Sequence, residues 1–160
     1  RNGFTPPDPQ FSGLQKPSEG IHFVEATLGN ALGYAAGIAH AKKMKGESGK
    51  VYCVVGDAVL TQGCMWEAVQ LAGKLKLDNL EMLIDNNGMG ILEEECTLQN
   101  LREKLTAFGW DTYGLFPNKP VVRIYETVKG AGVSFMETNP EWHYKMLDED
   151  SYNRAMEELS

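Results

Sequence analysis

Residues 51–88 read VYCVVGDAVLTQGCMWEAVQLAGKLKLDNLEMLIDNNG, and this stretch decides the fold. Its first five residues form a continuous apolar run, which is typical of a buried strand in a parallel sheet, and residues 80–84, apolar except for Glu81, predict a second strand. Between the two runs, apolar side chains recur every three or four residues from 65 to 75, which predicts a helix. A strand, a helix and a strand within this length predict a βαβ unit.

The sequence on either side of this unit continues the alternation. Its patterns predict a helix over 29–45, a helix over 98–108, strands over 121–127 and 133–136, and a helix over 152–159. This order predicts an α/β fold with an open, mostly parallel sheet and helices on both faces. Only about ten residues separate Trp110 from the strand at Val121, fewer than the dozen that a parallel crossover needs. Either residues 112–116 form no parallel strand, or this part of the sheet is reduced.

Proline content separates the beginning of the chain from the remainder. Residues 1–20 hold four of the seven prolines and predict an extended arm, whereas residues 21–160 predict a single α/β domain. The first residues contain neither Met nor the apolar core of a signal peptide, which is compatible with an internal boundary of a longer protein.

Composition excludes several classes of function. With 160 residues, 42% of them hydrophobic, the chain is able to bury a core and does not read as disordered. No apolar run approaches the roughly 20 residues of a membrane span. A net charge of −7, with no basic run longer than Lys42-Lys43, argues against nucleic acid or an anionic membrane as partner. Cys53, Cys64 and Cys96 match neither zinc spacing nor an even disulfide framework, which favours a cytoplasmic protein.

Polar residues follow both strands of the βαβ unit. Gly56-Asp57 comes directly after the first strand, and residues 85–88 come after the second. The carboxyl ends of parallel strands meet at one edge, where open α/β sheets bind ligands. Carboxylate, amide and carbonyl oxygens are the ligands that Mg²⁺ prefers, with phosphates completing its shell. Two simpler interpretations stay open: Asp57 caps the following helix, and Asn86 and Asn87 form a turn.

At this point the motifs resemble a known family. Gly56-Asp57 followed some thirty residues later by Asn86-Asn87 is similar to the signature of thiamine-diphosphate enzymes, and the surrounding sequence resembles the N-terminal half of transketolases. The stretches that carry the resemblance are LGNAL at 28–32, GDAVLTQGCMWEA at 56–68, KLDNL at 76–80, AFGW at 107–110, TVKGAGVSFME at 127–137 and PEWH at 140–143. The resemblance implies the thiamine-diphosphate-binding fold.

The resemblance also assigns cofactor and metal ligands. It implies that Asp57, Asn87 and the carbonyl of Met89 hold Mg²⁺. It further implies that Gly56 and Ala58 approach the diphosphate of the cofactor through their backbone. The cofactors implied are thus thiamine diphosphate and Mg²⁺.

Further residues gain a role only from the resemblance. Leu28 is expected to lie against the rings of the cofactor, and His143 near the diphosphate and the reacting centre; Glu67 is the remaining candidate for proton communication. Without the resemblance, His143 reads as a surface histidine and Lys129 as a surface lysine that could at most touch an anion.

The implied activity needs a partner. Transketolases move a two-carbon ketol group from a ketose to an aldose, and the glutamate that activates their cofactor lies in a separate pyrimidine-binding domain. The resemblance therefore implies that the partner is a C-terminal transketolase-like subunit, in a hetero-oligomer or a dimer of heterodimers. The implied substrate is a sugar phosphate or a related ketose.

Departures from the family pattern suggest an alternative function. Ala58 replaces a glycine that allows close backbone approach, Gln62 replaces a glutamate, and Tyr144 replaces a glycine. A histidine expected near residues 12–14 is missing. These changes favour a catalytically silent subunit with a binding or assembly role. Another interpretation, a decarboxylating thiamine enzyme, is disfavoured by residues 127–143.

Overall fold

The computed structural model describes residues 27–89, 99–143 and 145–160. They fall into two compact units, Thr27–Glu126 and Thr127–Ser160. The proline-rich arm predicted over residues 1–20 lies outside the described part of the chain. Within that part, no helix is both long enough and apolar enough to cross a membrane.

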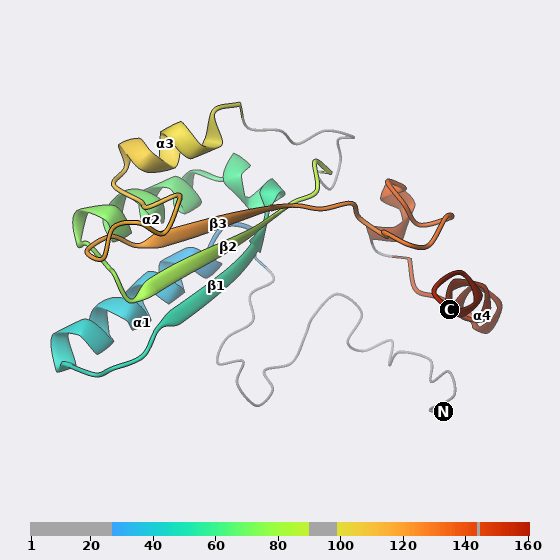
Figure 1. Ribbon diagram of the computed structural model, residues 1–160, viewed down its shortest axis with the longest axis horizontal. Helices are drawn as coiled ribbons and strands as arrows, with labels where there is room; N and C mark the ends of the chain where they lie inside the picture. Colours follow the sequence, from blue (N-terminus) through green and yellow to red (C-terminus); the bar gives the residue numbers. More distant parts are fainter. Residues whose placement is uncertain (1–26, 90–98, 144) are drawn as a thin grey trace. The chain divides into compact units, whose positions relative to one another are not determined.

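The larger unit contains an open parallel sheet, and the predicted fold class is confirmed. Its strands lie in the order β1-β2-β3 and all run parallel (Figure 1). The elements are α1 (Ala31–Lys45), β1 (Val51–Gly56), the 3₁₀ helix η2 (Asp57–Thr61), α2 (Gly63–Lys74), β2 (Leu80–Asn86), α3 (Leu101–Ala107) and β3 (Val121–Glu126). Each helix and strand predicted between residues 29 and 127 is present.

One face of the sheet forms the core with the helices. The strand register places Cys53, Met82 and Val122 in one row on this face, and all three are buried. The buried side of α1 consists largely of alanines, so the helix packs closely against β1 and β2. Residues of α1, α2 and α3 share a single hydrophobic cluster with this face of the sheet. Within the described residues of this unit, α1, α2 and α3 pack on this face of the sheet.

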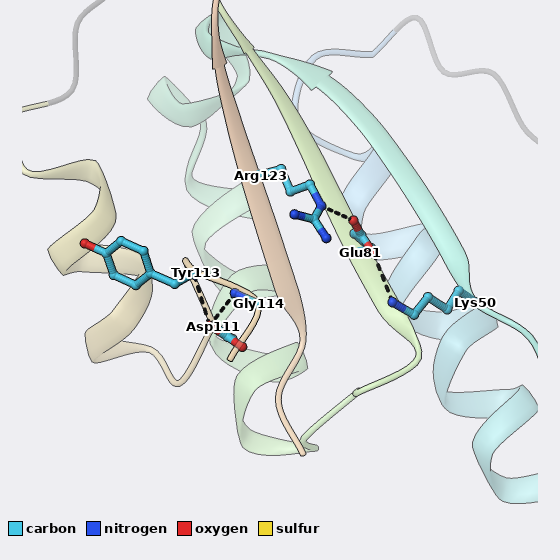
Figure 2. Close-up of polar contacts among 6 residues, drawn as sticks. All are labelled: Lys50, Glu81, Asp111, Tyr113, Gly114 and Arg123. Carbon is cyan, nitrogen blue, oxygen red and sulfur yellow. Dashed lines mark hydrogen bonds and ion pairs between the residues drawn. The ribbon is translucent and has the colours of Figure 1, made fainter. Parts of the chain in front are cut away.

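The opposite face carries an ion cluster. Glu81 in β2 is buried, and its carboxylate accepts hydrogen bonds from Lys50 Nζ at 3.1 Å and Arg123 Nε at 2.6 Å (Figure 2). Around the cluster, the side chains of Tyr52 and Val54 are largely exposed. Lys50 immediately precedes β1, Glu81 lies in β2 and Arg123 lies in β3, so the cluster links the strands on this face.

A loop connects α3 to β3. Asp111 makes an isolated parallel bridge to Val121. Its buried carboxylate accepts hydrogen bonds from the backbone N–H of Tyr113 at 3.0 Å and of Gly114 at 2.8 Å (Figure 2). It also accepts a hydrogen bond from the backbone N–H of Phe116 at 2.6 Å. The chain therefore turns back immediately into β3. Residues 112–116 thus form no parallel strand, and three of their backbone N–H groups donate to this carboxylate instead.

The smaller unit holds a 3₁₀ helix, η3 (Pro140–His143), and α4 (Glu149–Glu158). Asp148 caps α4 by accepting a hydrogen bond from the backbone N–H of Ser151 at 2.8 Å. The terminal helix predicted from the sequence is confirmed, but the strand predicted over 133–136 is wrong. Those residues form turns, because the glycines at 130 and 132 adopt positive φ angles that wind the backbone tightly.

Candidate functional site

The carboxylate of Asp57 joins the two polar clusters that follow β1 and β2. Asp57 is 2% exposed, and its Oδ2 accepts a hydrogen bond from the backbone N–H of Gly88 at 2.7 Å. Gly56, not Asp57, is the N-cap of η2, and it makes no side-chain cap hydrogen bond. The helix-cap interpretation of Asp57 is therefore wrong, because the side chain reaches across the edge of the sheet.

The surroundings of Asp57 act on its protonation in opposite directions. Burial raises the pKa of the carboxyl, and the negative charge of Asp85 raises it further. The backbone N–H groups of Gly88 and Ala58 lower it, but the net pKa lies above the usual value. A cation bound here would stabilise the charged carboxylate that burial disfavours.

The loop after β2 is ordered by its asparagines. Asn87 Oδ1 accepts a hydrogen bond from the N–H of Met89 at 2.9 Å, and Asn87 Nδ2 donates to Asp85 Oδ2 at 3.1 Å. Asn86 Nδ2 donates to Glu126 Oε2 at 2.7 Å, which ties the end of β2 to the end of β3. The turn interpretation is thus correct for Asn87. Its amide oxygen has a second lone pair, so the turn does not exhaust its capacity as a ligand.

The oxygen atoms at this edge suit a hard cation. Among the described residues, no group of three or more His, Cys, Asp or Glu side chains is placed to hold a metal. The residues of the predicted set instead offer one carboxylate, one amide oxygen and one backbone carbonyl, from Asp57, Asn87 and Met89. Mg²⁺ takes only a few ligands from protein when phosphates and water supply the others. The donor chemistry therefore fits.

The backbone beside Asp57 leaves room for a ligand. A Cβ atom built on Gly56, at the end of β1, meets no heavy atom within 4 Å outside its chain neighbours. Ala58 is half-buried in η2, where its carbonyl accepts a hydrogen bond from Thr61 Oγ1 at 2.8 Å. The methyl group of Ala58 thus lies in a segment that this internal hydrogen bond stabilises.

A tight contact that the sequence analysis did not identify joins the starts of α1 and α2. Gly29 has a φ of +96°, and a Cβ atom there would lie 2.7 Å from Gln62 Cβ and 2.8 Å from Cys64 Sγ. Leu28, which precedes this glycine, is 38% exposed. The only sequence signal was a glycine just before a predicted helix. The contact sets where Leu28 lies relative to the residues that follow η2.

Gln62 and Glu67 differ in their exposure to solvent. Gln62 is half-buried and donates a hydrogen bond from Nε2 to Thr61 Oγ1 at 2.8 Å. Glu67 is exposed on α2, one turn further along the helix. Trp66 and Trp110 donate their indole N–H groups to the carbonyls of Leu60 and Val69, and both belong to the packing of the unit.

His143 belongs to the smaller unit, where it contacts Lys129. The Nζ atom of Lys129 lies 3.3 Å from His143 Nδ1, and His143 is half-buried. Burial lowers the pKa of the His143 imidazole, and the positive charge of Lys129 lowers it further. Lys129 is therefore more than the solvated surface lysine that the sequence suggested. Tyr144, where the family has glycine, lies outside the described residues.

Comparison with known proteins identifies relatives of the chain. Residues 10–113 match the family model for 1-deoxy-D-xylulose-5-phosphate synthase. The chain is 36% identical to one of the subunits of apulose-4-phosphate transketolase from Actinobacillus succinogenes and 34% identical to the subunit of the same name from Phocaeicola vulgatus. These alignments include 91% and 88% of this chain, but 60% and 57% of the relatives. The chain thus spans less than two thirds of the length of these curated relatives.

Solved structures show the same fold. Transketolase from Campylobacter jejuni has a TM-score of 0.65 and 24% sequence identity, over 81% of this chain and 24% of that protein. A transketolase mutant from Pichia stipitis has a TM-score of 0.63 and 20% identity, over 84% of this chain and 28% of that protein. At these identities the match supports the architecture alone.

Proposed function

The chain belongs to the transketolase family and corresponds to the N-terminal region of its members, and on this premise we propose that it is the cofactor-binding subunit of a split ketol transferase. The reaction moves a two-carbon ketol group from a ketose to an aldose. The hydrogen bond between Asp57 and Gly88 is the observation that carries the proposal. It unites the residues after β1 with those after β2 at the edge where parallel sheets bind ligands.

In this proposal Mg²⁺ is held by Asp57, by Asn87 through its amide oxygen, and by the carbonyl of Met89. Gly56 and Ala58 approach the diphosphate of thiamine diphosphate through their backbone. The cofactor, when bound, supplies an electron sink for the two-carbon fragment. The protein contributes a buried carboxylate and fixed oxygen donors, which orient the diphosphate through the metal.

Three other residues have proposed roles. Leu28, fixed by the close approach of Gly29 to Gln62, lies against the cofactor rings and excludes water from them. His143 contacts the diphosphate and the reacting end of the substrate. Glu67 takes part in proton communication, a role that Gln62 lacks the carboxyl group to perform.

We further propose that the enzyme is completed by a second subunit with a pyrimidine-binding domain, in a hetero-oligomer or a dimer of heterodimers. The relatives from Actinobacillus succinogenes and Phocaeicola vulgatus are both named as one of several transketolase subunits, which supports a divided enzyme. Their names also favour a phosphorylated sugar as substrate. The partner would supply the glutamate that activates the cofactor.

A second candidate function is a catalytically silent subunit that keeps the fold and assembles with a partner. The methyl group of Ala58 and the uncharged Gln62 favour it, since both stand beside the proposed cofactor site. The substitutions Ala58→Gly and Gln62→Glu separate the two functions. If these departures weaken a working site, Ala58→Gly raises cofactor affinity and Gln62→Glu raises turnover. No gain from either substitution means that neither departure limits the site.

Calorimetric titration of thiamine diphosphate into the purified complex tests the proposal directly. Wild type is expected to bind only with Mg²⁺ present. Asp57→Asn keeps an oxygen that can accept from Gly88 but removes the charge, and it should weaken Mg²⁺-dependent binding by more than roughly 100-fold. Asp78→Asn removes the same charge from an exposed pair with Lys43 and should leave binding unchanged. Equal binding by wild type and Asp57→Asn would refute the ligand assignment.

A further inference from the structure

The contact between Lys129 and His143 determines which nitrogen of the imidazole carries its proton. The two atoms that meet are Lys129 Nζ and His143 Nδ1, 3.3 Å apart. An ammonium group has three donors and no acceptor, so the hydrogen bond requires Nδ1 to be unprotonated. A neutral imidazole with a bare Nδ1 carries its proton on Nε2. The contact therefore selects one of the two neutral tautomers.

The backbone around this pair holds it in place. The carbonyl of Lys129 accepts a hydrogen bond from the N–H of Thr138 at 3.0 Å, which closes the intervening turns. Gly130 lies so close to Met136 that a Cβ atom would approach its backbone to 2.6 Å. The turns between the two residues are therefore closed by backbone contacts.

The chain also fixes the other side of the pair. The ring of Trp142, the neighbour of His143, packs against Phe135 with 5.2 Å between ring centroids. The N–H of Trp142 donates to the carbonyl of Asn139 at 3.2 Å, and Asn139 Nδ2 donates to the carbonyl of Phe135 at 3.3 Å. These contacts place η3, and with it His143, against the turn that contains Lys129.

We propose that Lys129 is a positioning residue that holds His143 as the neutral Nε2–H tautomer. His143 then offers an N–H donor at Nε2, which suits an oxygen of a diphosphate or of a sugar. The opposite tautomer would offer a lone pair at Nε2 and repel such an oxygen. The use made of this donor rests on the proposed function, but the tautomer itself is a property of the chain without ligand.

Charge supports the same state. Partial burial and the charge of Lys129 both lower the pKa of His143, so the ring remains neutral at pH 7. A hydrogen bond from a charged donor biases the tautomer ratio by roughly tenfold or more. Without Lys129, the fraction of the Nδ1–H tautomer is expected to rise.

Long-range ¹H–¹⁵N correlation spectra of the full chain at pH 7.5 test the proposal, because protonated and bare ring nitrogens resonate at well-separated ¹⁵N frequencies. The signals of His143 are assigned with His22→Gln and His40→Gln variants. Wild type is expected to show the Nε2–H form almost exclusively. Lys129→Met should measurably raise the Nδ1–H fraction, and Lys129→Arg, whose side chain also has donors only, should retain the wild-type form.

Lys145→Met is the matched control. Lys145 lies two residues after His143, but its Nζ is placed over the ring of Trp142, 4.5 Å from the centroid. This variant should leave the His143 tautomer unchanged. An Nδ1–H form in wild type, or an unchanged ratio in a folded Lys129→Met variant, would overturn the proposal. The spectra need no cofactor, so this result is independent of whether thiamine diphosphate binds.

Discussion

Replacing Glu81 with glutamine tests how the strands are held together on the face that carries the ion cluster. Glu81→Gln preserves the shape of the side chain and removes its charge. In wild type the carboxylate accepts from Arg123 at 2.6 Å and from Lys50 at 3.1 Å, and its side chain is 7% exposed. The variant therefore leaves two cations facing a neutral amide on the sheet.

The size of the effect follows from the exposure of the partners. Breaking a fully buried ion pair costs about 3–5 kcal/mol. Here the side chains of Lys50 and Arg123 are about half exposed, so water solvates them when the carboxylate is gone. The uncharged glutamine also escapes the desolvation penalty that Glu81 carries, which offsets a further part of the lost stability. We expect a loss of about 1–2 kcal/mol, or a fall in Tm of roughly 2–8 °C for a chain of this length.

The effect should depend on pH in a defined direction. Burial raises the pKa of Glu81, but hydrogen bonds and charges from Arg123 and Lys50 outweigh it, and the net pKa lies below the usual value. A carboxyl group whose pKa is lowered by folding stabilises the protein above its unfolded pKa, and this contribution is lost as the pH falls through the folded pKa. The difference between wild type and Glu81→Gln should therefore be full at pH 7 and disappear in acid.

Urea denaturation followed by circular dichroism at pH 7 and at acid pH measures both quantities. Glu103→Gln, on the exposed surface of α3, is the control for the loss of one negative charge and should lie within about 0.5 kcal/mol of wild type. Equal stability of wild type and Glu81→Gln at pH 7, or a difference that persists in acid, would refute the reasoning.

Glycine substitutions and thiol labelling test other parts of the larger unit. Gly29→Ala introduces a Cβ at a φ of +96° and within 3 Å of two side chains, and it should destabilise the protein by about 2–4 kcal/mol in urea. Gly33→Ala, inside α1 with nothing within 4 Å, should be neutral or stabilising by up to about 1 kcal/mol; equal effects of the two would contradict the contact. In a Cys96→Ser background, a thiol reagent should label exposed Cys64 quickly and buried Cys53 only on unfolding, since burial raises the pKa of Cys53 to about 11. Rapid labelling of both thiols in the folded protein would refute the assigned burial of Cys53.

The βαβ unit was readable from the sequence because its physics is local. The largely apolar runs before Gly56 and Asp85 end where polar residues begin, and the strands extend only one or two residues beyond those runs. The meeting of Asp57 with the loop after β2 follows from the rule that carboxyl ends of parallel strands share an edge. The βαβ unit and the position of Asp57 beside this loop both depend only on the parallel direction of the two strands, which the helical crossover between them dictates.

The features that the sequence did not predict depend instead on contacts between residues that are distant in the sequence. Residues 133–136 look like a strand, yet they form turns, and Ser134 bonds to Glu158 in α4. Glu81 interrupts an apolar strand, and its partners lie 31 and 42 residues away. The contact of Lys129 with His143 spans 14 residues of irregular backbone. No period or motif encodes such pairings.

Native mass spectrometry of this protein, isolated gently from its own cells, tests the central proposal most directly. A single mass reports the partner, the stoichiometry and any bound cofactor. A cofactor-binding subunit of a split ketol transferase should appear in a complex with a second subunit, with the added masses of thiamine diphosphate and Mg²⁺. A complex that lacks the cofactor after thiamine diphosphate and Mg²⁺ have been supplied would contradict the proposal and favour the silent assembly subunit.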